Sequence, residues 1–287
     1  MNEYPIKRFL TLLLRIYIGI TSKIIVFIIL FFSRTFRGQL IQDIVLKHIW
    51  SKSTSLLHKG VNLNFVTPTA LTKYRAVTFA SKEPETLLWI EEFPEGSVLM
   101  DVGANVGIFS IYAALARNCK VYAIEPSLLN LDILLRNIVN NRVSKLVTVI
   151  PLALSDAAAV QTMFMSQQGF TWGGAHNSMG KNIGQDGQPL NAPIESSQLS
   201  ITIDSLISLF QLDEAKYVKI DVDGLELLVL KGAKNALRKV NSILIEVDTL
   251  HPGQDRAVTS VLSGLGFNRR FKIGNINLTE NQIWDRK

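Results

Sequence analysis

Five short apolar segments alternate with amphipathic segments over the second part of the chain, and this alternation constrains the fold most. The apolar segments are residues 97–102, 120–124, 146–150, 216–221 and 242–247. Segments of this length and composition are typical of parallel strands that are buried on both faces. With helices between them they predict an α/β fold with a doubly wound, mostly parallel sheet, which binds ligands at the carboxyl ends of its strands. Residues 266–273 and 275–284 are expected to close the sheet as an antiparallel pair.

Composition and charge exclude several classes of protein. Hydrophobic residues make up 47% of the chain and charged residues 19%, which excludes a disordered or fibrous protein. A single cysteine, Cys119, excludes a disulfide framework and a Cys-rich zinc site. The net charge of +6 is concentrated in residues 1–40, where six basic side chains face one acidic one. Because the remainder is nearly neutral, we expect no nucleic-acid partner.

Residues 1–37 are expected to form a hydrophobic, basic helical segment that associates with a membrane. From residue 9 to residue 32 the chain is mostly Leu, Ile, Val and Phe, interrupted by Arg15 and Lys23. The longest uninterrupted apolar run, residues 24–32, is shorter than the ~20 residues of a helical span. Three interpretations stay open: a marginal span, a helix lying on the membrane surface, and a helical hairpin that packs on its own domain. Basic residues at both ends suit anionic headgroups.

The remaining boundaries follow from the same patterns. Residues 38–69 are expected to be a linker that leads into a main domain of residues 70–287, located on the cytoplasmic side of the membrane. Before the five apolar segments, residues 61–66 and 73–79 are expected to be strands. Residues 152–200 interrupt the alternation and are rich in Gly, Ser, Gln and Asn. Because they follow the third strand on the ligand-binding edge, we interpret this insertion as a substrate lid.

The glycine loop, residues 101–107 with the sequence DVGANVG, is the first candidate site. Gly103 permits a tight turn, and the helix that follows offers N–H groups to a ligand. A dinucleotide fingerprint has the spacing G-x-G-x-x-G. Here Asn105 stands where the second glycine would face a pyrophosphate, which disfavours NAD. Asp101 would repel a pyrophosphate but suits the cationic methionine end of S-adenosylmethionine.

Glu125 ends the second predicted strand, 18 residues after Gly107. An ionised carboxylate at this place can accept hydrogen bonds from both hydroxyls of a ribose. NAD and S-adenosylmethionine both contain ribose, so Glu125 predicts a nucleoside cofactor without distinguishing the two.

Three carboxylates follow the fourth predicted strand within six residues: Asp221, Asp223 and Glu226. One of them can act as a general base for a substrate hydroxyl, or several can bind a divalent cation such as Mg²⁺ or Mn²⁺ that lowers the hydroxyl pKa. Glu246 and Asp248, which end the fifth strand, can join them. Asp221 is expected nearest to the reaction because it lies at the tip of its strand. Glu226 has a structural alternative, an ion pair with a neighbouring lysine.

Together these motifs resemble those of the FkbM family of S-adenosylmethionine-dependent methyltransferases. The resemblance covers about residues 70–250 and is carried by DVGANVGIFSIYAA with IEPS, by KIDVDGLELLVLKGA and by ILIEVD. It implies a seven-stranded methyltransferase sheet and methyl transfer to a hydroxyl oxygen, commonly on sugars or polyketide-like products. It also implies that the cofactor contacts residues of the first two motifs, namely Asp101, Gly103, Ala104, Asn105, Gly107, Glu125 and Pro126.

The sequence therefore predicts an S-adenosylmethionine-dependent O-methyltransferase that acts on a saccharide or another hydroxylated acceptor, including a lipid-linked one. The catalytic candidates are Asp221, Asp223, Glu226 and His176, the last of which lies in the insertion; no metal ligand set is defined. Two alternatives stay open. One is a membrane-tethered module that binds the cofactor without turnover, and the other is an NAD-dependent oxidoreductase on the same fold.

Overall fold

The computed structural model describes residues 4–286 except 168, 176, 181, 183–188, 190, 192–193 and 248–251. His176 and Asp248 therefore lie outside the described residues. The chain divides into two compact units, Met1–Lys52 and Ser53–Lys287, and each is described by itself.

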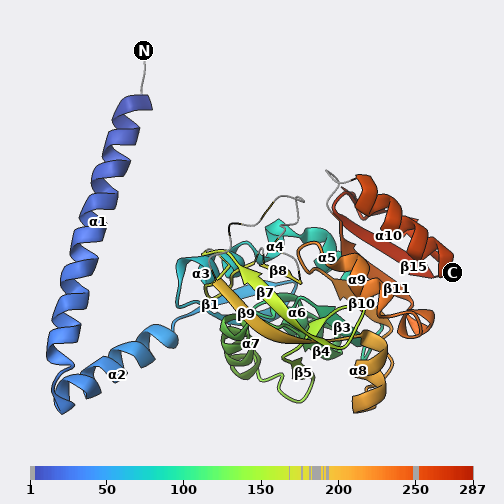
Figure 1. Cartoon of the computed structure of the whole chain (residues 1–287), viewed down its shortest axis with the longest axis horizontal. Helices are drawn as coiled ribbons and strands as arrows, with labels where there is room; N and C mark the ends of the chain where they lie inside the picture. Colours follow the sequence, from blue (N-terminus) through green and yellow to red (C-terminus); the bar gives the residue numbers. More distant parts are fainter. Residues whose placement is uncertain are drawn as a thin grey trace. The chain divides into compact units, whose positions relative to one another are not determined.

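The first unit consists of two helices, α1 (Tyr4–Phe32) and α2 (Phe36–Trp50) (Figure 1). The Thr35 hydroxyl begins α2 by accepting a hydrogen bond from the Gly38 N–H at 3.1 Å, as helix-capping residues do. From residue 17 onward most large apolar side chains of both helices are exposed, including Phe27 and Ile44. Within the described part of the chain, no helix combines the length and hydropathy that crossing a membrane requires, so the span expected through residues 9–32 finds no support.

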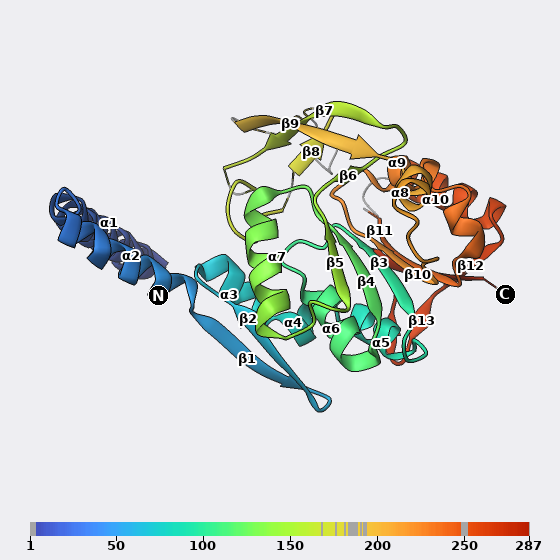
Figure 2. The same cartoon turned by 90° about the horizontal axis from the view of Figure 1, so that it is seen from below.

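The second unit is built on a mixed sheet of seven strands, which Figure 2 shows side by side. Their order is β12 (Phe267–Arg270), β15 (Asn281–Arg286), β11 (Ser242–Glu246), β10 (Tyr217–Ile220), β3 (Val98–Val102), β4 (Lys120–Ile124) and β5 (Val147–Ile150). The last five are parallel, and β15 is antiparallel to both β11 and β12. The predicted mostly parallel sheet of seven strands is thus confirmed.

Helices cover both faces of this sheet because its strands are apolar on both sides. Leu99 of β3 packs in one core with α5 (Pro84–Glu91), α6 (Ile108–Arg117) and α7 (Leu128–Asn140). Met100, the next residue, packs in a second core with α8 (Ile203–Phe210), α9 (Glu226–Lys231), α10 (Pro252–Gly264) and the 3-10 helix η1 (Ala236–Lys239). Successive side chains of a strand point to opposite faces, so a run without polar residues serves two cores.

The order of the strands creates a switch point between β3 and β10. The chain runs outward from β3 to β4 and β5, and then returns to the other side of β3 to form β10 and β11. The connections that leave β3 and β10 therefore cross to opposite faces of the sheet. A crevice opens between them at the carboxyl ends of the strands, which is where ligands bind in open α/β sheets.

The segment before the sheet differs from its prediction in one place. Strands β1 (Ser53–His58) and β2 (Val61–Val66) form a hairpin, but residues 73–79, predicted as a strand, belong mainly to helices α3 (Ala70–Val77) and α4 (Phe79–Lys82). The Thr69 hydroxyl accepts from the Thr72 N–H at 3.2 Å, and the Thr72 hydroxyl accepts from the Thr69 N–H at 3.1 Å. This reciprocal cap starts α3 and outweighs the β-branched residues that suggested a strand.

The insertion contains a small sheet of its own, which the sequence analysis did not predict. Its strands are β6 (Ala153–Leu154), β9 (Ile194–Ile201), β7 (Ala159–Met165) and β8 (Asn177–Met179), in that order across the sheet. Near the carboxyl end of the chain, β13 (Lys272–Ile273) and β14 (Ile276–Asn277) pair around Gly274. Met163, Met165 and Met179 of the insertion pack with Leu225, which follows β10. The insertion is thereby held against the crevice.

Candidate active site

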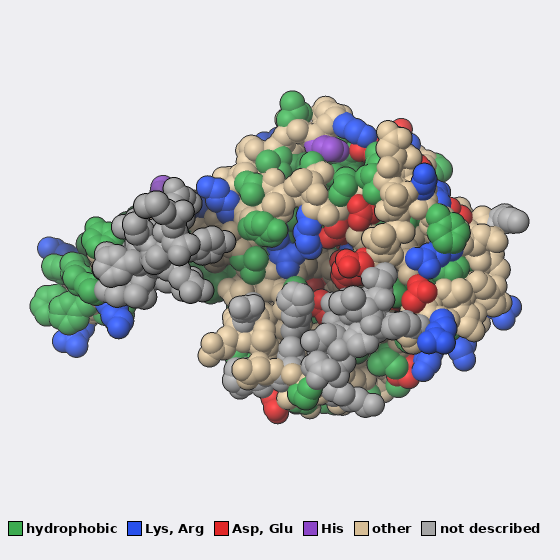
Figure 3. Space-filling view, turned by 90° about the horizontal axis from the view of Figure 1, so that it is seen from above, with side chains coloured by type: hydrophobic (Ala, Val, Ile, Leu, Met, Phe, Trp, Pro, Cys, Tyr) green, Lys and Arg blue, Asp and Glu red, His purple; other side chains and the backbone are tan. Residues whose placement is uncertain are grey.

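A cavity of about 370 Å³ lies at the carboxyl ends of β3, β4, β10 and β11, a volume typical of small-molecule sites. Its charged lining residues are Arg75, Lys82, Glu83, Glu125, Lys219, Asp221, Asp223 and Glu246. Figure 3 shows acidic and basic side chains gathered in a hollow on the face seen from above. The cavity thus coincides with the crevice at the switch point and brings the two predicted motifs together.

The two glycines of the glycine loop are required by packing within the protein. Gly103 has a φ of +85°, and a Cβ atom there would lie 1.8 Å from the carbonyl oxygen of Asp221. Gly107 has a φ of +80°, and its Cβ would lie 2.2 Å from a methyl carbon of Leu134. Gly103 lines the cavity whereas Gly107 does not. The close approach that Gly103 permits is therefore between β3 and the end of β10, and not only towards a ligand.

The N–H groups of the glycine loop are bonded within the protein. The N–H groups of Gly103 and Ala104 both donate to the Ile124 carbonyl at 3.0 Å, and that of Gly107 donates to the Ala104 carbonyl at 2.8 Å. The N–H of Asn105 donates to Glu125 Oε2 at 2.8 Å. The N–H of residue 106 donates to the Asn105 side chain at 2.9 Å. The helix that the sequence analysis expected to offer N–H groups from residue 106 begins at Ile108, so the N–H groups of residues 106 and 107 belong to the bonded loop.

Glu125 is a buried carboxylate on the wall of the cavity, with Pro126 beside it. Its Oε1 accepts from the Ser127 N–H at 2.9 Å, and its Oε2 accepts from the Asn105 N–H. Burial raises the pKa of Glu125 to about 7, although these hydrogen bonds work in the opposite direction. Each carboxylate oxygen has two lone pairs. Oε1 also accepts from Asn130 Nδ2 at 3.4 Å, so capacity for a further donor is left on Oε2. The side chain is thereby oriented before any ligand binds.

Asp101 lies behind the cavity wall rather than on it. Its side chain is 1% exposed, and Oδ2 accepts from the Ser110 hydroxyl at 2.5 Å. Burial raises the pKa of Asp101, while the nearby Lys219 opposes that effect. Its other oxygen, Oδ1, is buried and receives no hydrogen bond from any described residue. A buried acceptor without a donor is unfavourable, which makes this atom a place for a buried water to bind.

Asp221, at the tip of β10, is paired with a buried lysine. Lys219 Nζ lies 2.6 Å from Asp221 Oδ2, and the Lys219 side chain is 2% exposed while that of Asp221 is 28% exposed. Burial works to raise the pKa of Asp221, but the charge of Lys219 together with hydrogen bonds from Glu246 and Lys219 outweighs burial, and the pKa lies below its usual value. Glu246 hydrogen-bonds to Asp221, and burial together with the Asp221 charge raises the pKa of Glu246 to about 9. Asp221 is therefore ionised at neutral pH beside a protonated Glu246.

The other predicted catalytic residues have separate positions. Asp223 lines the cavity with a φ of +51°. Glu226 is fully buried away from the lining, where Oε1 accepts from the Gly224 N–H at 2.9 Å and Oε2 accepts from Gln254 at 2.7 Å. Burial raises the pKa of Glu226 to about 7. No group of three or more metal-binding side chains occurs among the described residues, so the predicted divalent cation finds no support.

Two residues that the sequence analysis missed, Asn130 and Arg75, connect the cavity to the insertion. Asn130 Nδ2 donates to the Gly174 carbonyl at 3.1 Å, and Arg75 Nε donates to the Gly173 carbonyl at 2.6 Å. Asn105 Nδ2 also donates to the Gly174 carbonyl, at 2.7 Å. No motif in a single sequence marks such contacts, because their partners lie about 40 to 100 residues away along the chain.

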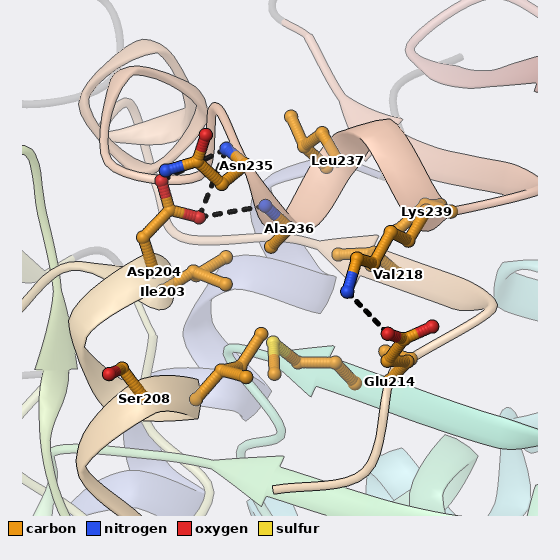
Figure 4. Close-up of a pocket in the computed structure, with 13 residues that line it drawn as sticks. Ile203, Asp204, Ser208, Glu214, Val218, Asn235, Ala236, Leu237 and Lys239 are labelled. Carbon is orange, nitrogen blue, oxygen red and sulfur yellow. Dashed lines mark hydrogen bonds and ion pairs between the residues drawn. The ribbon is translucent and has the colours of Figure 1, made fainter. Parts of the chain in front are cut away.

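A second cavity of about 260 Å³ lies among α8, β10 and η1 and is mostly apolar (Figure 4). Its charged residues are paired: Asp204 accepts from the Ala236 N–H at 2.8 Å, and Lys239 forms an ion pair with Glu214. These pairs leave the first cavity as the better candidate for chemistry.

A family model described as the methyltransferase FkbM domain matches residues 101–271, more than half of the chain. The chain belongs to the FkbM methyltransferase family. This confirms the resemblance that the motifs indicated. The match begins at Asp101 and ends just after β12, so it includes the glycine loop, Glu125, the insertion and the acidic cluster after β10.

Each of the similar proteins described next matches this chain over only part of its own length. It is 32% identical over 179 residues to the hexuronic acid methyltransferase AglP of Haloferax volcanii, covering 61% of this chain and 65% of AglP. It is 27% identical over 196 residues to the 31-O-demethyl-FK506 methyltransferase FkbM of Streptomyces tacrolimicus, covering 61% and 74%. A crystal structure of methyltransferase FkbM from Methylobacillus flagellatus KT is similar with a TM-score of 0.44 and 18% identity, covering 68% of this chain and 44% of that one. The chain thus spans less than two thirds of AglP.

The packing of Gly103 against Asp221 can be tested by adding one methyl group. Gly103→Ala should lower the free energy of unfolding by about 1–3 kcal/mol more than Gly96→Ala, measured by chemical denaturation. Gly96 is the matched control because it also has a positive φ, +75°, but a Cβ there meets nothing within 4 Å. Equal losses in the two variants would mean that β3 and β10 do not need this close approach.

Proposed function

We propose that the protein is an S-adenosylmethionine-dependent O-methyltransferase that acts on a hydroxyl group of a saccharide or similar acceptor. The observation that carries the proposal is the arrangement of Glu125 and Asp221 on one cavity at the switch point of the sheet. A carboxylate oriented for a ribose, after β4, and an ionised carboxylate at the tip of β10, on the other side of β3, are the two groups that such a reaction needs. Membership of the FkbM family supports the same conclusion.

The residues of the cavity fit this cofactor. Glu125 keeps an acceptor lone pair on Oε2 for a ribose hydroxyl. Asn105, Ala104 and Pro126 line the cavity beside it. The ionised carboxylates of the lining, Asp221 and Asp223 among them, attract a cationic group, and Arg75, Lys82 and Lys219 of the same lining balance part of their charge. When bound, S-adenosylmethionine supplies a methyl group on a cationic sulfur.

The bonding of the glycine loop argues against the oxidoreductase alternative. A pyrophosphate binds to free N–H groups at the start of a helix. The N–H groups of residues 103–107 already donate to acceptors within the protein. A dinucleotide would therefore have to break these hydrogen bonds or bind beyond the loop, at the first residues of α6.

Asp221 is our proposed base. A hydroxyl group has a pKa far above 7, so its proton must be removed as the oxygen reacts. Lys219 keeps Asp221 ionised at neutral pH, and the partial exposure of Asp221 leaves it accessible from the cavity. Asp223 lines the same cavity and is proposed to orient the acceptor. Because Glu226 does not line the cavity, we propose a structural role for it, in which it holds the turn at Gly224.

The acceptor side of the cavity is formed by the insertion. Met163 and Met179, together with Leu152 and Leu154, give it an apolar wall next to the charged floor. A wall of this kind suits the less polar face of a sugar ring or a lipid-linked saccharide. Relatives named for a hexuronic acid and for 31-O-demethyl-FK506 support a hydroxylated acceptor. The insertion therefore serves in this proposal as the acceptor wall.

We also propose that the first unit attaches the protein to an anionic lipid surface, with its helices lying in the plane of the surface. Residues 1–52 contain eight basic and two acidic residues, so this unit carries +6, the net charge of the whole chain. Its exposed apolar side chains include Phe27, Phe31 and Phe36, at 68%, 55% and 75% exposure. Exposed apolar surface combined with positive charge is typical of helices that bind membrane surfaces.

Glu125 should control the affinity for the cofactor. Glu125→Gln should weaken S-adenosylmethionine binding by roughly 5- to 150-fold, which corresponds to ~1–3 kcal/mol for a lost partner. Because ribose hydroxyls donate to the ionised carboxylate, wild-type affinity should rise several-fold as the pH increases through about 7, and the variant should lose this dependence. Isothermal titration calorimetry measures the affinity and its dependence on pH. The control is Glu214→Gln, which changes an exposed carboxylate at the second cavity. Unchanged affinity in Glu125→Gln would remove the ribose contact from the proposal.

Asp221 should control turnover. Asp221→Asn should keep cofactor affinity within a few fold and lower the rate of methyl transfer by roughly 100-fold or more, the scale of lost acid–base catalysis. The assay is transfer of a radiolabelled methyl group to fractionated glycans, lipids and metabolites. Full activity of the variant would exclude Asp221 as the base. Cofactor binding without transfer to any fraction by the wild-type protein would favour the non-catalytic module instead.

Membrane attachment should depend on the exposed phenylalanines. The full chain should float with vesicles that contain 30% phosphatidylserine and not with purely zwitterionic vesicles. The reason is that each basic residue near an anionic surface contributes ~1 kcal/mol to binding. The double variant Phe27→Ser, Phe31→Ser should lose flotation, because the two rings lie together 6.3 Å apart on α1. The control Leu57→Ser changes an equally exposed apolar residue of the second unit. Wild-type protein that stays unbound but self-associates would point to a second copy as the partner.

A further inference from the structure

Asn130, in the first half of α7, touches both sides of the cavity. Its side chain is 2% exposed. Nδ2 donates to Glu125 Oε1 at 3.4 Å and to the Gly174 carbonyl at 3.1 Å. Oδ1 accepts from the Gly173 N–H at 2.9 Å. One amide group thus uses both of its donors and its acceptor to connect the nucleoside side of the cavity to the insertion.

The carboxylate of Glu125 determines which way this amide faces. An ionised carboxylate is an acceptor only, so it must face the NH₂ group of Asn130 rather than its oxygen. With the NH₂ group turned to Glu125 and to the Gly174 carbonyl, Oδ1 is left facing the Gly173 N–H. A reversed amide would put an oxygen beside a carboxylate and would lose the bond to Gly173. The orientation of Asn130 is therefore linked to the state of Glu125.

The same turn of the insertion has further anchors that meet at this point. Asn105, whose N–H bonds to Glu125, also donates through its side chain to the Gly174 carbonyl. Arg75 of α3 donates a hydrogen bond to the Gly173 carbonyl. The insertion turn, residues 169–175, is thus bonded to two neighbours of Glu125. Gly174 and Ala175 continue directly into the cavity wall.

We propose that Asn130 is a positioning residue that couples occupancy of the Glu125 side of the cavity to docking of the insertion turn, and so to formation of the acceptor wall. The inference rests on the proposed function, since it takes Glu125 to bind the ribose. Ribose hydroxyls that donate to Glu125 favour its ionised, acceptor-only form, which holds the Asn130 amide in the orientation that bonds the turn. By linkage, the docked turn strengthens binding at Glu125 by the same factor.

The test is hydrogen exchange of the amides of residues 169–175, followed by mass spectrometry or NMR in the full chain. S-adenosylhomocysteine, the demethylated product, is the probe. In the wild-type protein, saturating probe should slow exchange of these amides by about 5- to 150-fold, the usual range of coupling between sites. In Asn130→Ala the probe should still bind, but the slowing should be lost. Asn130→Asp, which keeps the shape and cannot donate, should behave like Asn130→Ala.

Asn141, which directly follows α7, provides the matched control. Its side chain bonds the backbone N–H and carbonyl of Asn64, each at 2.8 Å, and does not line the cavity. Asn141→Ala should keep the wild-type slowing. Slowing that persists in both Asn130 variants, or a wild-type protein that binds the probe with no slowing, would overturn the coupling.

Failure of the proposed function gives a different result. If the wild-type protein does not bind the probe, the proposed cofactor is wrong, and the ligand-linked coupling that depends on it is overturned with it. If the probe binds and slows exchange through Asn130 but no acceptor is methylated, the coupling stands and the catalytic proposal fails.

Discussion

The close approach of Gly103 to the carbonyl oxygen of Asp221 is the constraint on which the site depends. It joins the carboxyl ends of β3 and β10, the two strands between which the order of the sheet reverses. Only a glycine fits there, because a side chain would meet the backbone of the neighbouring strand. This contact puts the glycine loop and the Asp221 carboxylate on one cavity. The loops to either side then diverge and leave room for a ligand.

Electrostatics at this junction depend on one buried cation. Lys219 lies under the cavity floor, bonded to Asp221 and close to Asp101, with Phe109 5.2 Å from its Nζ. A lone buried charge is strongly unfavourable, so Lys219 requires carboxylates around it. It keeps Asp221 ionised, while Glu246 holds a proton. The acids of the cavity therefore do not act alike: Asp221 is paired directly with the lysine, whereas burial and the charge of Asp221 raise the pKa of Glu246.

The sequence predicted the parts of the fold that come from local patterns. The five apolar segments became β3, β4, β5, β10 and β11 because a buried parallel strand needs a continuous apolar run. The prediction of a strand at residues 73–79 was wrong, because the cap formed by Thr69 and Thr72 starts a helix there. The sequence analysis also missed the insertion sheet. Strands such as β9, with the sequence IESSQLSI, are held mainly by pairing with β7, and such pairing is not a local pattern.

The sequence predicted most of the acidic residues of the candidate site, but not how their side chains are arranged. Asp221, Asp223 and Glu125 do line one cavity, as expected from strand tips that meet at one edge. Asp101 and Glu226 point into the protein, because Asp101 lies within β3 and bonds to Ser110 of α6, and Glu226 lies in α9 and bonds to Gly224 and Gln254. Asn130 and Arg75 carry no motif and act through contacts with a distant segment. Only the three-dimensional structure shows that Asn130 and Arg75 belong to the site.

The most direct test of the account is a crystal structure of the protein with S-adenosylhomocysteine. The account predicts that the ribose hydroxyls lie within hydrogen-bond distance of Glu125 and that the sulfur faces Asp221 across the same cavity. Product bound in the apolar cavity among α8, β10 and η1, or in the main cavity with its ribose away from Glu125, would contradict it.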